Sequence, residues 1–93
     1  MKKIFKYLID GEDITLPAGS KILSITTQRD NIVMYAIIDP DIKDKMVYSF
    51  LVIGTGHEIT KDLNDYTFSG TVSLLGGGFM FHIFYKLNKY LPG

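Results

Sequence analysis

The residues best suited to chemistry lie where an apolar run ends in Gly54-Thr55-Gly56-His57. Glycines let the backbone approach a ligand, and successive N–H groups in such a turn form a concave nest for an anion. Thr55 and His57 would add a hydroxyl and a ring donor. The spacing is not that of a dinucleotide fingerprint or a P-loop, because no third glycine and no Gly-Lys-Ser/Thr follows. The sequence therefore predicts an anion site here. The alternative is a strand exit that needs two glycines.

Cationic and aromatic side chains elsewhere complete the candidate binding set. Arg29 is the only arginine among ten basic residues, so it alone can hold a phosphate through two parallel hydrogen bonds. A solvated charge is the simpler interpretation of an arginine in an expected turn. Lys6 faces away from Phe5 and Tyr7 in an alternating strand, where it can line a ligand groove. Tyr7 can stack on a base, although such tyrosines more often lie in a core or an interface.

The two histidines, His57 and His82, make a poor set of metal ligands in a chain without cysteine. His57-Glu58 does not start a zinc-protease motif, because position 61 holds a lysine. His82 lies on an expected strand and is typical of a half-buried histidine with one hydrogen-bond partner. No Gly-x-Ser-x-Gly elbow is present. We therefore expect neither an enzyme nor a cofactor. The hydrolase alternative rests on His57 or His82 acting with Glu58.

The elements that hold these residues are expected to be short strands. Runs rich in Ile, Val, Phe, Tyr and Thr recur between Gly, Asp, Asn and Pro, which indicates an antiparallel β fold. The expected strands cover residues 4–9, 13–16, 21–28, 32–38, 46–53, 67–75 and 79–85. Tight turns at 29–31 and 76–78 make two hairpins, residues 57–66 have room for a helical turn, and a polar Lys-Asn-Lys tail ends the chain. The predicted fold class is all-β, a small antiparallel sheet, sandwich or barrel of about six to seven short strands with at most a short helical turn, in one domain, residues 1–93.

The overall composition narrows the range of partners. Ten basic and ten acidic residues give zero net charge, which argues against a general DNA-binding surface. No apolar run approaches the roughly 20 residues that cross a bilayer, so we expect no membrane partner. The absence of cysteine fits a reducing cytoplasm.

Three expected strands, 32–38, 46–53 and 79–85, are apolar on both faces. A chain this small has a thin core, and these strands carry more apolar surface than one such core covers. We therefore expect a symmetric homo-oligomer, a dimer or a tetramer, that buries the surplus. The alternative is that one of these strands is the central strand of a tight barrel.

The order of motifs along nearly the whole chain resembles a widespread group of small bacteriophage proteins. The matching segments are Ile4-Phe5-Lys6-Tyr7, Leu16-Pro17-Ala18-Gly19-Ser20-Lys21-Ile22-Leu23-Ser24, Gln28, Tyr35-Ala36-Ile37-Ile38-Asp39-Pro40, Gly54-Thr55-Gly56-His57-Glu58-Ile59, Gly70-Thr71 and Gly77-Gly78-Phe79-Met80-Phe81-His82-Ile83-Phe84. This group is similar to phage anti-CBASS sponge proteins, which sequester cyclic nucleotide signals as homo-oligomers.

The resemblance implies a non-enzymatic protein in the cytoplasm of the infected bacterial host. There it would capture a cyclic dinucleotide immune signal in a pocket at an oligomer seam. The single arginine departs from what is expected of a phosphate binder and weakens the case for tight phosphate recognition. The alternative is a phage interaction module or inhibitor that binds a host protein and no small molecule.

Overall fold

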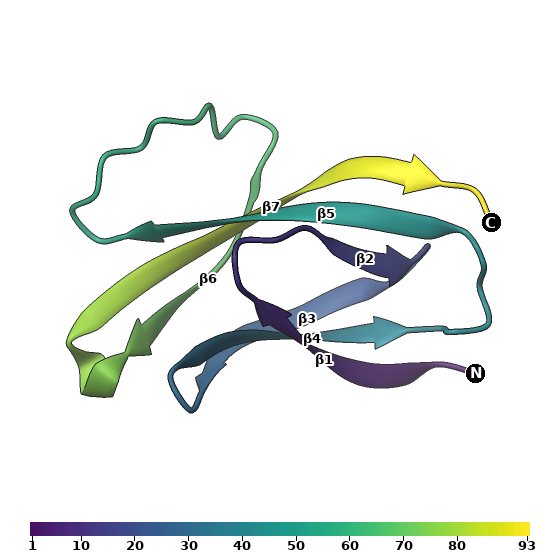
Figure 1. Ribbon diagram of the computed structural model, residues 1–93, viewed down its shortest axis with the longest axis horizontal. Helices are drawn as coiled ribbons and strands as arrows, with labels where there is room; N and C mark the ends of the chain where they lie inside the picture. The colour runs from purple at the N-terminus through teal and green to yellow at the C-terminus, as the bar shows by residue number, and fades with distance from the viewer.

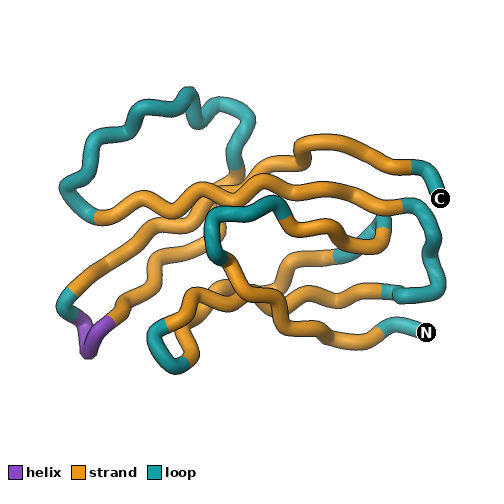
Figure 2. The backbone as a smooth tube through the Cα atoms, in the orientation of Figure 1, coloured by secondary structure: helices purple, strands orange, loops and turns teal.

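The computed structural model describes residues 1–93, and most of the chain is β-strand (Figures 1 and 2). A single 3-10 turn, η1 (Leu75–Gly77), lies between the last two strands. The chain has no helix with the length and apolar character that crossing a membrane requires. The seven strands are β1 (Lys3–Ile9), β2 (Ile14–Pro17), β3 (Lys21–Gln28), β4 (Asn31–Ile38), β5 (Lys45–Gly54), β6 (Thr67–Leu74) and β7 (Phe79–Leu91).

The strands form two antiparallel sheets, which confirms the predicted all-β fold. Sheet A has the order β1-β4-β3, and sheet B has the order β2-β5-β7-β6. The inner faces of the two sheets share one apolar core. At one side of the sandwich β3, a border strand of sheet A, lies against β6, a border strand of sheet B. At the other side β1 has β4 as its only substantial neighbour.

Side-chain alternation explains how the core is filled. Every second residue of β4 points toward sheet B, where it meets residues from β2, β5, β6 and β7. Met34, Leu16 and Ile83 are completely buried at the centre. The buried core residues are Ile9, Ile14, Leu16, Ile32, Met34, Ala36, Ile38, Phe50, Val72 and Ile83.

The β3–β4 connection confirms the predicted hairpin. Its two loop residues, Arg29 and Asp30, have φ of 50° and 61°. Positive φ at both positions is the geometry of a type I′ turn, whose twist matches that of the flanking strands. The carboxylate of Asp30 also accepts a hydrogen bond from the backbone N–H of Leu75 at 3.2 Å, so this turn is bonded to η1, which connects β6 and β7 of sheet B.

Two local predictions are wrong. Residues 57–66 contain no helical turn and form an irregular loop; the one helical turn lies instead at 75–77, where the glycine turn was expected. Gly76 and Gly77 adopt positive φ there, which glycine allows at no steric cost, and Leu75 also has positive φ, at 52°. The expected polar tail is also strand, because β7 continues to Leu91 and pairs with Lys45–Ser49 of β5.

Candidate functional site

The outer face of sheet A carries a groove that gathers residues from three strands. Lys6 comes from β1, Asn31 from β4, and Gln28 with the adjoining Arg29 from the end of β3. The groove has a volume of about 400 Å³, and its two apolar residues are Leu8 and Val33. We call this set of six residues the Lys6 groove.

Strand register explains why these residues meet. Lys6 lies opposite Tyr35, and Gln28 lies opposite Asn31, on either side of β4. Lys6 Nζ donates a hydrogen bond to Gln28 Oε1 at 2.7 Å, so the bond crosses β4 between Asn31 and Tyr35. Val33 lies under that crossing, which accounts for its 4% exposure on a face that points away from the core.

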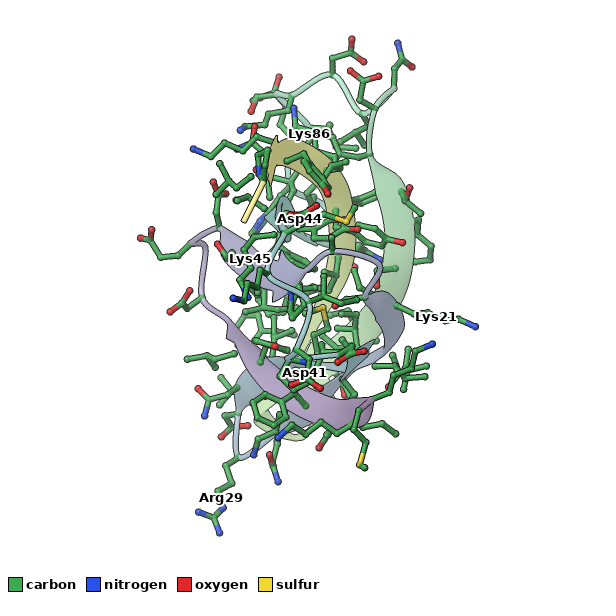
Figure 3. The ribbon with its side chains drawn as sticks, turned by 90° about the vertical axis from the view of Figure 1, so that its right-hand side faces the viewer. Lys21, Arg29, Asp41, Asp44, Lys45 and Lys86 are labelled. Atoms are coloured by element: carbon green, nitrogen blue, oxygen red, sulfur yellow. The ribbon has the colours of Figure 1, made fainter.

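Arg29 completes the cationic character of the Lys6 groove. Its side chain projects from the end of the molecule, away from the body of the fold (Figure 3). It makes no side-chain hydrogen bond or ion pair within the chain, so all its donors are free to meet a ligand. One ammonium, one guanidinium and two side-chain amides therefore offer donors on one surface, which is the chemistry that binds a phosphate or a carboxylate.

Tyr7 does not belong to this groove. It lies on the inner face of β1 and packs against the core cluster, while Lys6 points outward from the same strand. Burial raises the pKa of the Tyr7 hydroxyl above its ordinary value. Within one chain, Lys6 and Tyr7 therefore lie on opposite faces of sheet A.

The Gly54-Thr55-Gly56-His57 segment is a β-turn at the exit of β5. The N–H of His57 donates to the carbonyl of Gly54 at 3.0 Å, and Gly56 has φ of +85°, as the third residue of a type II turn requires. The N–H of Thr55 donates to the carbonyl of Met80, also at 3.0 Å. Because these two amides have partners within the chain, the turn has the geometry of the strand-exit alternative and not that of an open anion nest.

A second cavity, of about 420 Å³, adjoins this turn. It is bordered by Gly54, Thr55, His57 and the start of β7 around Phe79 and Phe81. It shares no residue with the Lys6 groove. The structure thus divides the predicted site into three parts: Lys6 with Arg29, the 54–57 turn, and Tyr7 in the core.

Comparison with protein families gives a match, over residues 1–91, to a family described as a domain of unknown function (DUF7352). The chain belongs to the DUF7352 family. No curated protein and no solved structure matches it. The matched residues span all seven strands, so the Lys6 groove and the 54–57 turn both lie within the DUF7352 domain.

His82 of the DUF7352 domain has both ring nitrogens engaged. Thr55 Oγ1 lies 2.7 Å from Nε2, and Thr71 Oγ1 lies 2.9 Å from Nδ1. The sequence correctly indicated a half-buried strand histidine but gave it one partner instead of two. The second partner arises because Thr71 of β6 lies opposite His82 of β7, a pairing that only the register reveals.

Two groove residues, Gln28 and Asn31, were not among the predicted site residues. Both flank the type I′ turn that presents Arg29. The sequence could have indicated both residues through their position beside Arg29 in an expected hairpin, because a turn brings the residues on its two sides together.

Proposed function

We propose that this DUF7352 protein is a phage-encoded, non-enzymatic binding protein that sequesters a cyclic nucleotide or cyclic dinucleotide immune signal. It acts as a homo-oligomer in the cytoplasm of the infected host and so inhibits anti-phage defence. The observation that carries the proposal is that Lys6 and Arg29, with the side-chain amides of Gln28 and Asn31, line one groove. The phage setting rests on the resemblance of the motif order.

The Lys6 groove suits a phosphodiester attached to a planar base. The ammonium of Lys6 and the guanidinium of Arg29 supply charge-assisted hydrogen bonds to phosphate oxygens. Leu8, which is 50% exposed, supplies an apolar surface for a base or a sugar. The volume of about 400 Å³ lies within the range of small-molecule sites. The chain has no net charge, so its affinity for an anion must come from such a local cluster.

The surface area supports the oligomeric part of the proposal. The chain exposes 6055 Å². A monomeric protein of 10.5 kDa is expected to expose about 5,400 Å². The surplus approaches the roughly 800 Å² that each partner contributes to a standard interface. Large apolar side chains are also exposed, among them Ile4 at 61% and Leu8 at 50%.

Calorimetric titration with a panel of cyclic mononucleotides and dinucleotides tests the proposal. We expect heat from at least one compound, and about tenfold or greater weakening in Lys6→Ala and in Arg29→Ala, because each removes a charge-assisted bond. Lys21→Ala is the matched control. It removes the same charge from the opposite end of β3, where Figure 3 shows Lys21 pointing in a different direction from Arg29.

Two results would contradict the proposal. Absence of heat from every compound at micromolar protein would exclude nucleotide capture. Recovery of a chemically altered ligand after long incubation would instead support the hydrolase alternative, with His57 or His82 acting beside Glu58. Recovery of the intact ligand is the expected outcome.

A second candidate function is supported by the β6–β7 hairpin tip. Leu75, Phe79 and Met80 are 61%, 55% and 42% exposed there, and Leu75 has a φ of 52°, which is unusual for a bulky residue. Such a tip suits a host protein with an apolar cleft. A monomer in light scattering, no heat from nucleotides, and a specific partner lost in Leu75→Ser/Phe79→Ser but kept in Leu87→Ser would favour this function.

A further inference from the structure

β1 is a border strand whose outer edge is not covered. Of the other border strands, β3 and β6 lie against each other, and β2 has four residues and ends at Pro17, which has no N–H to donate. β1 has seven residues and pairs only with β4. In Figure 1 it forms the lower margin of the fold on the side of the N-terminus. A row of backbone donors and acceptors along β1 therefore has no partner within the chain.

The side chains of β1 make this edge receptive to another strand. Ile4 and Leu8 are 61% and 50% exposed on the outer face, and Phe5 is 45% exposed on the inner face. Border strands are commonly protected by lysines. Here Lys6 is turned over its own sheet toward Gln28, and Lys3 Nζ lies 5.1 Å from the centre of the Phe5 ring. Neither lysine is held across the edge.

The charges around β1 favour a second copy of the same strand as the partner. Lys2 and Lys3 stand at its start, and Asp10 and Glu12 follow its end. None of these four side chains forms an ion pair within the chain. Antiparallel pairing of two copies brings the basic start of each strand to the acidic end of the other, whereas parallel pairing aligns like charges. We propose that two copies join through their β1 edges, antiparallel, to form one continuous six-stranded sheet.

Symmetry and side-chain direction select the register. The two-fold axis must be perpendicular to the sheet, so outward-facing residues pair with outward-facing residues. Centring the axis on Lys6 places Ile4 opposite the partner's Leu8 and Phe5 opposite the partner's Tyr7. It also places Lys2 opposite the partner's Asp10. Lys6 lies opposite the partner's Lys6, but each ammonium is turned away from the seam toward its own Gln28, which limits the repulsion between the two charges. Shifting the axis to Tyr7 would set Ile4 against the partner's Asp10, and shifting it to Phe5 would lose the charge pair.

The pairing places the two Lys6 grooves on one continuous face, and this step rests on the proposed function. Lys6 and Leu8 form the β1 side of each groove, and each Lys6 ammonium is turned away from the seam toward its own Gln28. Arg29 and the partner's Arg29 follow strands that lie five strand spacings, roughly 24 Å, apart. Each groove therefore takes its own nucleotide, which gives two sites in each dimer.

The absence of native cysteine allows a direct test on the ligand-free protein. In the proposed register, residue 6 lies opposite itself at about 4.5–5.5 Å between Cα atoms, within disulfide range. Lys6→Cys should therefore form a covalent dimer on mild oxidation. Phe5→Cys and Tyr7→Cys, each about 7–8 Å from its own copy, should not. Thr15→Cys, an exposed position on β2, is the control.

Light scattering of the unmodified protein accompanies the cysteine variants. A mass of twice the chain, with cross-linking confined to position 6, is the expected result. A monomer at high concentration would overturn the pairing, and cross-linking strongest at position 5 or 7 would overturn the register. Because no nucleotide is present, these outcomes are separate from the calorimetric test. A dimer that binds no nucleotide would leave the pairing intact and remove the proposed function.

Discussion

At the residue scale, the hydrogen bond between Lys6 and Gln28 positions a cation before any ligand arrives. The bond fixes a long and flexible side chain over β4. Fixing such a side chain in advance reduces the rotamer entropy that binding would otherwise cost. Gln28 therefore acts as a positioning residue for the ammonium of Lys6, and its neutral amide leaves the positive charge available to an anion.

Gln28→Glu tests this role with an almost isosteric change. The new carboxylate would pair with Lys6 and repel an incoming phosphate, so we expect nucleotide affinity to fall at least tenfold in calorimetry. Gln28→Met removes the hydrogen bond without adding a charge and should weaken binding only severalfold. Equal affinity of Gln28→Glu and the unmodified protein would place the phosphate elsewhere.

Gly56 offers a separate test of the 54–57 turn. A Cβ at this position would meet nothing within 4 Å, but the backbone has φ of +85°. Gly56→Val should therefore reduce the free energy of unfolding by about 1–3 kcal/mol through backbone strain. Gly56→Asn should cost less, because asparagine tolerates this conformation. Denaturant unfolding measures both variants. If Gly56→Val instead abolished nucleotide binding at unchanged stability, the anion nest would regain support.

The placement of Tyr7 shows what residue-level reasoning could and could not predict. Alternation along β1 already set Lys6 and Tyr7 on opposite faces, so the sequence held the information that they serve different surfaces. The sequence alone could not predict that Lys6 and Arg29 would line the same groove. These residues are brought together because β4 lies between β1 and β3, and strand order is a non-local property.

At the element scale, the strands were predicted well because the distribution of apolar residues along each strand reflects which of its faces are buried. β4 was expected to be apolar on both faces, and it is the central strand of sheet A. The C-terminal half of β7 was missed because Lys86 and Lys89 resemble a solvated tail. That half pairs with β5 but extends beyond the reach of β6 on its other side. Its lysines therefore border water, where charge is compatible with a strand.

The end of β7 should respond to pH in a defined way. Asp44 accepts hydrogen bonds from the N–H of Gly93 and from the hydroxyl of Tyr90, which lower its pKa below the ordinary value of 3.8. The same carboxylate raises the pKa of Tyr90 above 10.0. Asp44 therefore adds to the free energy of unfolding above about pH 4, and this stabilisation is lost as the pH falls through the pKa of Asp44 in the folded state. Tyr90 adds to the free energy of unfolding below about pH 10, and this stabilisation is lost as the pH rises through the pKa of Tyr90 in the folded state.

Amide NMR spectra between pH 2 and 11 check this prediction. Resonances of residues 89–93 should shift at both limits of the range while those of the core strands remain unchanged. Asp44→Asn keeps an acceptor oxygen but cannot titrate, so the acid transition should disappear in this variant. An acid transition that persists in Asp44→Asn would assign it to another carboxyl group.

At the scale of the whole molecule, the exposed surface is the property that most constrains behaviour. Half-buried and exposed apolar residues occur on both sheets, and only 14 of 93 residues are buried. A chain with so small a core has a small free energy of unfolding by itself. Association would therefore supply a large share of the stability of the folded state.

The thermal midpoint should consequently depend on protein concentration. For a dimer, a tenfold increase in concentration adds about 1.4 kcal/mol, which corresponds to roughly 3–6 °C for an assembly of this size. Differential scanning calorimetry over two decades of concentration measures the effect. An Ile4→Lys/Leu8→Lys variant, charged along the β1 edge, should lose the dependence. A midpoint that is constant for the unmodified protein would indicate a self-sufficient monomer.

The proline that ends β2 has a consequence for how far association can proceed. Once two β1 strands are joined, the other long border strands of each chain, β3 and β6, lie against each other. β2 is too short and has too few backbone N–H donors to pair with a strand of a third chain. Further pairing through β2 is thereby disfavoured, and Lys86 and Lys89 protect the half of β7 that β6 does not reach. The proposed sequestering role requires amounts of protein comparable to those of the captured signal, and a chain that halts at pairs can reach such abundance without precipitating.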